Sequence, residues 1–189
     1  MAMPGNVVAE WLLEEVRMTV DSFRWIPPSL TAWLKETWIL PDERGSVPFA
    51  RLKKPLSEAR LAVLTTGGLY VRGEQEPFDM ERERADPDWG DPSHRVIPSD
   101  TQPGKIAVSH GHYNPADVES DHNVLFPLQR LVELRDSGAI GSIAPSAYSV
   151  MGYQGHPGPN WGPWREETGP AILAQMQAEG VEGALLTPA

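Results

Sequence analysis

Two histidines separated by one residue stand out in the segment "AVSHGHYNPADVESDHNVLF", residues 107–126. His110 and His112 follow an apolar run, and a third histidine, His122, lies beside Asp121. In an extended strand, residues two apart point to the same side, so the imidazoles of His110 and His112 are expected to project together. Such a pair can bind a divalent metal with Asp121 as a further ligand. It can equally serve acid–base chemistry or substrate hydrogen bonding near neutral pH, or have a structural role.

Phenol and amide side chains accompany the two histidines. Tyr113, Tyr148 and Tyr153 can donate hydrogen bonds or protons, although tyrosines at strand ends more often pack their rings. Asp121 and Asn123 precede a predicted helix, and capping of that helix explains them equally well. The predicted catalytic residues are His110, His112, Tyr113 and Tyr148, and the predicted substrate contacts in this half of the chain are Asp121, Asn123, Met151 and Tyr153.

A turn rich in hydroxyls and glycines follows the segment "KKPLSEARLAVL". Leu61 to Leu64 form a short apolar run that predicts a strand, and Thr65, Thr66, Gly67 and Gly68 come directly after it. Glycines and hydroxyls let backbone N–H groups approach an anion or a carbonyl oxygen. We therefore predict substrate binding by these four residues, with an ordinary turn at a strand end as the alternative.

The elements that must position these residues begin with helices. Apolar residues at helical spacing predict one amphipathic helix over Val7–Val20 and a second over Ser29–Trp38. Four of the seven tryptophans lie in this part of the chain, which favours a buried aromatic contact. We predict that residues 1–45 form a helical segment that packs on the core or on an oligomer partner, and that residues 46–189 form an α/β domain.

The remainder alternates between strand and helix patterns. After the strand at 61–64, strands are predicted over 105–113, 140–153 and 181–189, and helices over 123–138 and 167–180. The polar segment from Arg72 to Pro103 is rich in proline, glycine and charge, so it is expected to be a long loop without regular structure, of a kind that is usually functional or partly disordered.

This alternation predicts an α/β fold, a three-layer sandwich with a mainly parallel sheet of the flavodoxin or Rossmann type and additional N-terminal helices. In such sheets ligands bind outside the carboxyl ends of the strands. Four polar segments are expected to converge there: Thr65–Gly68, Ser109–Tyr113, Tyr148–Tyr153 and Thr187–Ala189.

Composition excludes several function classes. The net charge of −10 disfavours nucleic acids and anionic membrane surfaces as partners. No apolar run is long enough to span a membrane and no secretory leader is evident, so we expect a cytoplasmic protein. The 189 residues contain no cysteine, which excludes disulfides and thiolate chemistry within them. Nothing indicates a nucleotide or flavin cofactor, and a small-molecule substrate is expected.

Several segments together resemble one enzyme family over roughly residues 48–189. They are "PLSEARLAVLTTGG", "EPFD", "GDPSHRVIP", "SHGHYNPADVESDHNVLFPLQRLVEL", "GAIGSIAPSAYSVMGY" and "EGVEGALLTPA". This combination resembles the selenoprotein B family of glycine, sarcosine, betaine and D-proline reductases, especially its short, D-proline-reductase-like members. The resemblance implies an oxidoreductase that cleaves a C–N bond of a small amine or amino-acid-like substrate, as a homo-oligomer or as a subunit of a reductase complex.

The resemblance also implies a selenocysteine or cysteine directly after a strand that ends in "LLTP". Here the sequence reads "LLTPA", so the reactive residue is expected at the next position. A selenocysteine codon read as a stop, a shortened chain, or loss of the redox residues would each give this ending. Asn114, Ser146–Ala147 and His122 depart from the family pattern, which leaves the substrate open.

Two other function classes compete with this interpretation. One is a non-redox, metal-dependent hydrolase or lyase that uses His110 and His112 on the same scaffold. The other is a non-catalytic complex subunit, in which the tryptophan-rich N-terminal segment forms the interface.

Overall fold

The computed structural model describes residues 26–37, 50–86, 88–154 and 161–189. Contacts divide the chain into two compact units, residues 1–43 and residues 44–189, which are described separately. In the first unit, helix α2 spans Pro28–Thr37, close to the predicted Ser29–Trp38. The helix predicted over Val7–Val20 lies outside the described residues, and the packing of the first segment on the core or on a partner stays a prediction. No helix among the described residues is long and apolar enough to cross a membrane.

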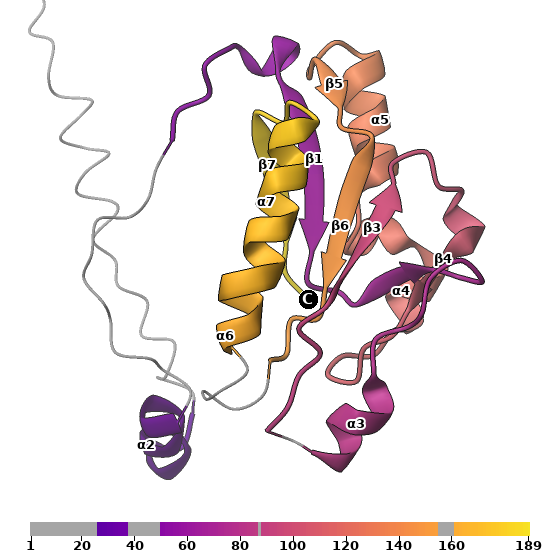
Figure 1. Cartoon of the computed structure of the whole chain (residues 1–189). Helices are drawn as coiled ribbons and strands as arrows, with labels where there is room; N and C mark the ends of the chain where they lie inside the picture. Colours follow the sequence, from indigo (N-terminus) through magenta and orange to yellow (C-terminus); the bar gives the residue numbers. More distant parts are fainter. Residues whose placement is uncertain (1–25, 38–49, 87, 155–160) are drawn as a thin grey trace, which may run out of the picture. The chain divides into compact units, whose positions relative to one another are not determined.

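A five-stranded sheet forms the centre of the second unit (Figure 1). Strand β1 (Arg60–Thr65) pairs in parallel with β7 (Gly183–Thr187) along one edge. Along its other edge it pairs in parallel with β5 (Ser142–Ile143) and then β6 (Ser146–Val150). Strand β3 (His94–Pro98) adds to β6 in the antiparallel sense. The prediction of an α/β fold with a mainly parallel sheet is therefore confirmed.

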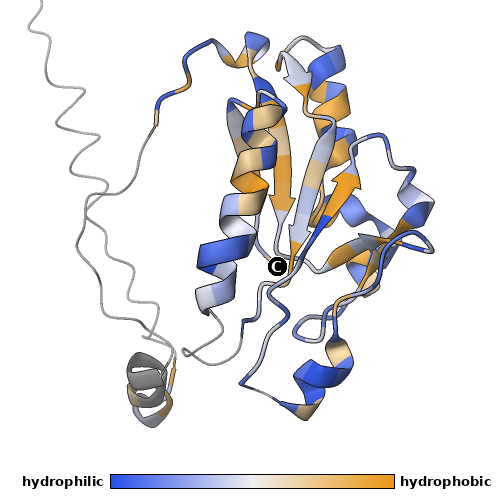
Figure 2. Ribbon diagram, in the orientation of Figure 1, coloured by the Kyte–Doolittle hydropathy of each residue, from blue (hydrophilic) through white to orange (hydrophobic). Residues whose placement is uncertain are grey.

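The core lies on both faces of this sheet, because successive side chains of a strand point to opposite faces. Val63 of β1 packs in a cluster with Leu128 and Leu131 of helix α5 (Leu128–Asp136). Its neighbour Ala62 belongs to a second cluster with Ile172 of helix α7 (Gly169–Ala178). Figure 2 shows the corresponding apolar colouring along β1 and β3. Leu134, on the outer side of α5, is 43% exposed.

An antiparallel ribbon stands beside the main sheet. It pairs β2 (Leu69–Val71) with β4 (Ile106–Val108), with Leu69 opposite Val108. The strand predicted over 105–113 therefore ends at Val108 and does not join the parallel sheet. The sequence that follows, Ser-His-Gly-His-Tyr-Asn-Pro, favours bends over extension because of its glycine and Asn-Pro pair. His110 and His112 consequently lie on a loop.

The segment from Arg72 to Pro103 is not a structureless loop, contrary to prediction. It contains helix α3 (Met80–Ala85) and strand β3. The Asp79 carboxylate accepts a hydrogen bond from the Arg82 backbone N–H at 2.9 Å and so caps α3. The remaining short elements are 3₁₀ helices η1 (Leu56–Glu58), η2 (Pro103–Lys105) and η3 (His122–Val124), helices α4 (Ala116–Ser120) and α6 (Trp161–Pro163), and the π-helical turn η4 (Trp164–Thr168).

Replacement of Gly68 by alanine should strongly destabilise the protein. Gly68 has a φ of +65°, and an added Cβ would lie 2.4 Å from the Ser109 carbonyl oxygen. The left-handed conformation alone costs a non-glycine residue about 1–2 kcal/mol, and the clash with backbone adds to it. We expect a loss of about 3 kcal/mol or more in the free energy of unfolding, measured by denaturant titration.

Gly73→Ala is the matched control for this measurement. Gly73 has a φ of +77°, but no atom lies within 4 Å of an added Cβ. Its loss should therefore be limited to the backbone cost of about 1 kcal/mol. Equal losses for the two variants would show that the contact between Gly68 and Ser109 is not a constraint.

Candidate functional site

The four polar segments expected at the carboxyl ends of the strands do meet there. Thr65 at the end of β1 lies opposite Thr187 of β7 and Ser149 of β6. The Ser109 N–H donates to the Gly68 carbonyl at 2.8 Å, which ties the loop after β4 to the same edge. The predicted convergence of these segments is therefore confirmed.

The Thr-Thr-Gly-Gly turn uses its polar groups internally. The Thr65 hydroxyl oxygen accepts from the Gly67 N–H at 3.1 Å, and the Gly68 N–H donates to the Val150 carbonyl at 3.1 Å. The Thr66 hydroxyl oxygen accepts from the Ala189 N–H at 2.8 Å. These N–H groups therefore hold the strand ends together and are already bonded within the protein. Substrate binding by Thr65, Thr66, Gly67 and Gly68 stays a prediction.

His110 and His112 lie close together although they are not on a strand. Their ring centroids are 5.6 Å apart and nearly perpendicular, at 88°. The His112 backbone N–H donates to Nδ1 of His110 at 3.1 Å. The Tyr113 ring lies 4.4 Å from the His110 ring, and the Tyr113 hydroxyl donates to the Gly67 carbonyl at 2.8 Å. This hydrogen bond joins the histidine loop to the turn after β1.

A buried carboxylate holds the second histidine. His112 Nε2 lies 2.5 Å from Oε1 of Glu83 on α3, and the Glu83 side chain is only 5% exposed. The other carboxylate oxygen, Oε2, is buried and has no hydrogen-bond partner among the described residues. The Tyr153 ring stacks on the His112 ring, with centroids 4.0 Å apart and planes at 28°. We refer to His110, His112, Tyr113 and Tyr153 as the ring cluster.

Glycine between the two histidines permits this packing. A Cβ on Gly111 would lie 2.6 Å from the terminal methyl carbon of Met80 and 3.6 Å from Glu83 Oε1. The loop can therefore approach α3 closely enough for His112 to reach Glu83. Glu83 was not among the predicted site residues because it lies in a segment that was predicted to be a loop. The signal that marks α3 is the capping residue Asp79 ahead of a run of good helix formers.

Burial shifts the pKa values of His110, Tyr113 and Tyr153 in the direction that favours their neutral forms. Desolvation, with a further contribution from the charge of His112, lowers the pKa of His110 to about 4. Desolvation and then the charge of Glu119 raise the pKa of Tyr113 to about 12. The pKa of Tyr153 is raised by desolvation and then by the negative charges of Glu83, Asp88 and Asp86. His110 and Tyr113 are consequently both uncharged at neutral pH.

Four of the predicted site residues lie elsewhere or have structural partners. Tyr148 is fully buried in the core cluster under α7, where burial and the charge of Glu179 raise its pKa to about 12. Met151 is fully buried and bridges to Gly67. The Asp121 carboxylate caps η3 by accepting from the Asn123 N–H at 3.0 Å, and the Asn123 side-chain amide bonds Gln129 at 2.7 Å. Asp121 therefore caps the short η3 and not the longer α5, which has no side-chain cap, whereas Asn123 bonds Gln129 in the first turn of α5.

The described residues do not gather a set of metal ligands. Among them, no group of three or more histidine, aspartate or glutamate side chains is arranged to hold a metal ion. His110 and His112 approach each other, but Asp121 is engaged with Asn123. A metal site formed by His110, His112 and Asp121 therefore has no geometric support in this part of the chain.

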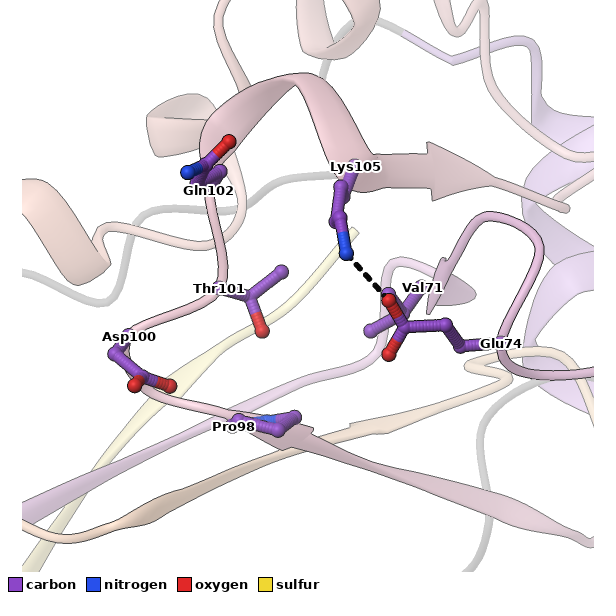
Figure 3. Close-up of a pocket in the computed structure, with 7 residues that line it drawn as sticks. All are labelled: Val71, Glu74, Pro98, Asp100, Thr101, Gln102 and Lys105. Carbon is purple, nitrogen blue, oxygen red and sulfur yellow. Dashed lines mark hydrogen bonds and ion pairs between the residues drawn. The ribbon is translucent and has the colours of Figure 1, made fainter.

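Two hollows differ in their relation to the ring cluster. A hollow of about 530 Å³ beside α3 includes Met80 and Ser109 in its lining, so it adjoins the loop that carries His110 and His112. A smaller cavity of about 230 Å³ lies beyond Pro98, where Lys105 and Glu74 form an ion pair at 2.6 Å (Figure 3). Pro98 pairs with Ser146 at the start of β6, so this cavity lies near the amino ends of the parallel strands, away from the ring cluster.

Curated proteins similar to this chain are reductase subunits. The D-proline reductase subunit gamma of Acetoanaerobium sticklandii is 34% identical over 134 residues, which cover 71% of this chain and 50% of that protein. The glycine reductase complex component B subunit gamma of Carboxydothermus hydrogenoformans is 27% identical over 134 residues, which cover 71% of this chain and 29% of that protein. The chain thus spans about half of the first relative and less than a third of the second.

The comparison with solved structures gives no significant match. The family model of glycine/sarcosine/betaine reductase selenoprotein B, in contrast, matches residues 36–189, which include every strand of the sheet and the whole ring cluster. The chain therefore belongs to the glycine/sarcosine/betaine reductase selenoprotein B family.

Proposed function

We propose that this chain supplies the substrate pocket of a reductase that cleaves the C–N bond of a small amine or amino-acid-like substrate. The observation that carries the proposal is the ring cluster at the carboxyl edge of the parallel strands, with His112 held by the buried Glu83 at 2.5 Å. Family membership supports the reductase assignment, and the subunit names of the two curated relatives support a role within a complex. We further propose that it works in the cytoplasm.

His110 acts as a neutral hydrogen-bond donor in this proposal. Its Nδ1 accepts a hydrogen bond from the His112 backbone N–H, so in the neutral ring the proton resides on Nε2. The lowered pKa of about 4 keeps the ring neutral throughout the physiological range. Nε2–H can therefore orient a carboxylate or carbonyl oxygen of the substrate without adding a positive charge to the pocket.

His112 is the proposed proton donor to the departing nitrogen. Its Nε2–H donates to Glu83, which leaves Nδ1 as the ring nitrogen that can exchange a proton with substrate. A buried carboxylate bonded to one imidazole nitrogen orients the ring and fixes its tautomer. Glu83 is thus a positioning residue, and stacking on Tyr153 restricts the rotation of the same ring.

The bond-breaking step needs a thiolate or selenolate, which none of the 189 residues can supply. In the proposed reaction this nucleophile attacks the carbon next to nitrogen, the C–N electron pair leaves with nitrogen, and nitrogen takes a proton. A second thiol then attacks the sulfur or selenium atom and forms a disulfide or selenosulfide, and the released carbon keeps the electron pair of the broken bond and takes the proton of that thiol. Because the Ala189 N–H is bonded to Thr66, a residue attached to Ala189 would lie about 4 Å further along the chain, at this same edge.

The ionisation of His110 can be tested by NMR. We expect its ring resonances to titrate with a pKa near 4, whereas an ordinary histidine titrates near 6.5. Because the unfolded chain binds this proton more readily, His110 should make unfolding easier as pH falls from about 6.5 to about 4. His110→Gln identifies the resonance and should weaken this pH dependence of stability. A His110 titration midpoint above 6 would contradict its assignment as a neutral donor.

The role of His112 can be tested by kinetics in the assembled reductase. Removal of a general acid typically costs 10²–10⁴-fold in rate, so His112→Gln should lower kcat by about 100-fold or more with a smaller change in KM. Glu83→Gln should lower kcat in the same direction, because the ring loses its charged partner. His122→Gln is the control, since His122 lies on η3, outside the ring cluster. An unchanged kcat in both His112→Gln and Glu83→Gln would show that His112 takes no part in the reaction.

A further inference from the structure

We propose that Asp91 is a positioning residue for His112, because it joins the two parts of the chain that hold this imidazole. One part is the start of helix α3, which carries Glu83, and the other is the pair Tyr153 and Gln154. Asp91 itself is only 7% exposed. Its importance for the reaction rests on the proton-donor role proposed for His112, whereas the positioning of the ring does not.

Helix α3 cannot hold Glu83 in place by its own packing. The helix spans only Met80–Ala85, well below the length at which an isolated helix is stable in water. Glu83 is its only buried residue, so no buried apolar side chain anchors the helix in the core. The place of the Glu83 carboxylate therefore depends on how the residues around the helix are fixed.

The Asp91 carboxylate fixes the start of α3. Its Oδ2 accepts a hydrogen bond at 3.0 Å from the backbone N–H of Asp79, the N-cap residue of the helix. Its Oδ1 accepts from the Ser93 backbone N–H at 2.9 Å and from the Ser93 hydroxyl at 2.5 Å. Both carboxylate oxygens are therefore bonded, and hydrogen bonds to a charged acceptor are stronger than those between neutral groups.

Arg95 strengthens the same junction between the segments "EPFD" and "GDPSHRVIP". Its guanidinium donates to the carbonyl oxygens of Glu76 at 2.7 Å and of Pro77 at 3.0 Å. The chain just before α3 is thus bonded to the segment that contains Asp91 through both its N–H and its C=O groups.

The backbone of the same segment contacts the residues beside the other face of the site. The Asp91 carbonyl oxygen accepts a hydrogen bond at 2.8 Å from the side-chain amide of Gln154, which directly follows Tyr153. A Cβ on Gly90 would clash with the Tyr153 carbonyl oxygen, so the two segments lie in close contact. A shift of Asp91 would therefore reach His112 in two ways, through the carboxylate bonded to its Nε2 and through the ring stacked on its face.

Asp91→Asn tests the carboxylate contact, because an amide would place an N–H group opposite one of the backbone N–H donors. In NMR spectra of the ring nitrogens of the isolated chain, we expect His112 to change from the Nε2–H tautomer to a mixture of tautomers. Its Nε2–H proton should exchange with solvent about tenfold faster or more. Asp100→Asn, which removes one charge from an exposed position beside the smaller cavity, is the matched control and should leave the His112 spectrum unchanged.

Gln154→Met provides a second variant in case Asp91→Asn does not fold. The Gln154 amide oxygen has no hydrogen-bond partner among the described residues, so methionine removes only the donations to the carbonyl oxygens of Asp91 and Met151. The exchange of the His112 Nε2–H proton should again become faster. An unchanged His112 spectrum in the folded variants would overturn the proposal, whatever the activity of the reductase.

Kinetics of the assembled reductase test whether this positioning matters for the reaction. Asp91→Asn should lower kcat by about tenfold with a smaller change in KM, since a small misplacement of a reacting group lowers the rate steeply. Added to Glu83→Gln, it should lower kcat by less than about a further twofold, because the Asp91 carboxylate reaches His112 through Glu83. Losses that multiply in the double variant would contradict this route. If His112→Gln leaves kcat unchanged while Asp91→Asn still alters the His112 tautomer, the proton-donor role fails and the positioning role stands.

Discussion

The architecture of the site depends on the close contact between Gly68 and Ser109. Gly68 accepts a hydrogen bond from the Ser109 N–H, donates its own N–H to Val150, and leaves no space for a side chain. This contact brings the end of the β2–β4 ribbon to the carboxyl edge of the parallel sheet. Together with the hydrogen bond from the Tyr113 hydroxyl to the Gly67 carbonyl, it positions the loop that carries His110 and His112 relative to β1 and β6. A backbone position that only glycine can occupy thus determines where the imidazoles lie.

The sequence predicted the framework better than the chemistry. The short apolar run before Thr65 and the alternation of strands and helices gave the parallel sheet and the meeting of the strand ends, because burial on both faces leaves a strong periodic signal. Tyr148 was assigned to the site, but the Ser-Ala-Tyr-Ser-Val strand is fully buried on both faces, so its pattern does not indicate which side chains face a ligand. Asp121 was equally ambiguous, because a helix cap and a ligand use the same carboxylate.

Glu83 illustrates what sequence patterns leave out. Its partner His112 is 29 residues away, and nothing local distinguishes Glu83 from the other acidic residues of its segment. Only the three-dimensional packing of α3 against Gly111 shows that this carboxylate is buried beside an imidazole. The raised pKa of Tyr153 also depends on the three-dimensional packing, since burial comes first and Glu83, Asp86 and Asp88 then act on its hydroxyl through space. The site therefore places two uncharged rings, His110 and Tyr113, near this negative charge.

The pairing of β1 with β7 also has a consequence for how the protein is made. Thr65 and Thr187 are 122 residues apart, yet they are neighbours at the functional edge. During synthesis β1 emerges early, and the functional edge cannot form until β7 has also been synthesised. Parallel pairing between such distant segments is slow, because the entropy of loop closure is lost before the contacts form. Until then the apolar β1 lacks one neighbour, and the nascent chain presents an aggregation-prone edge of the kind that chaperones bind.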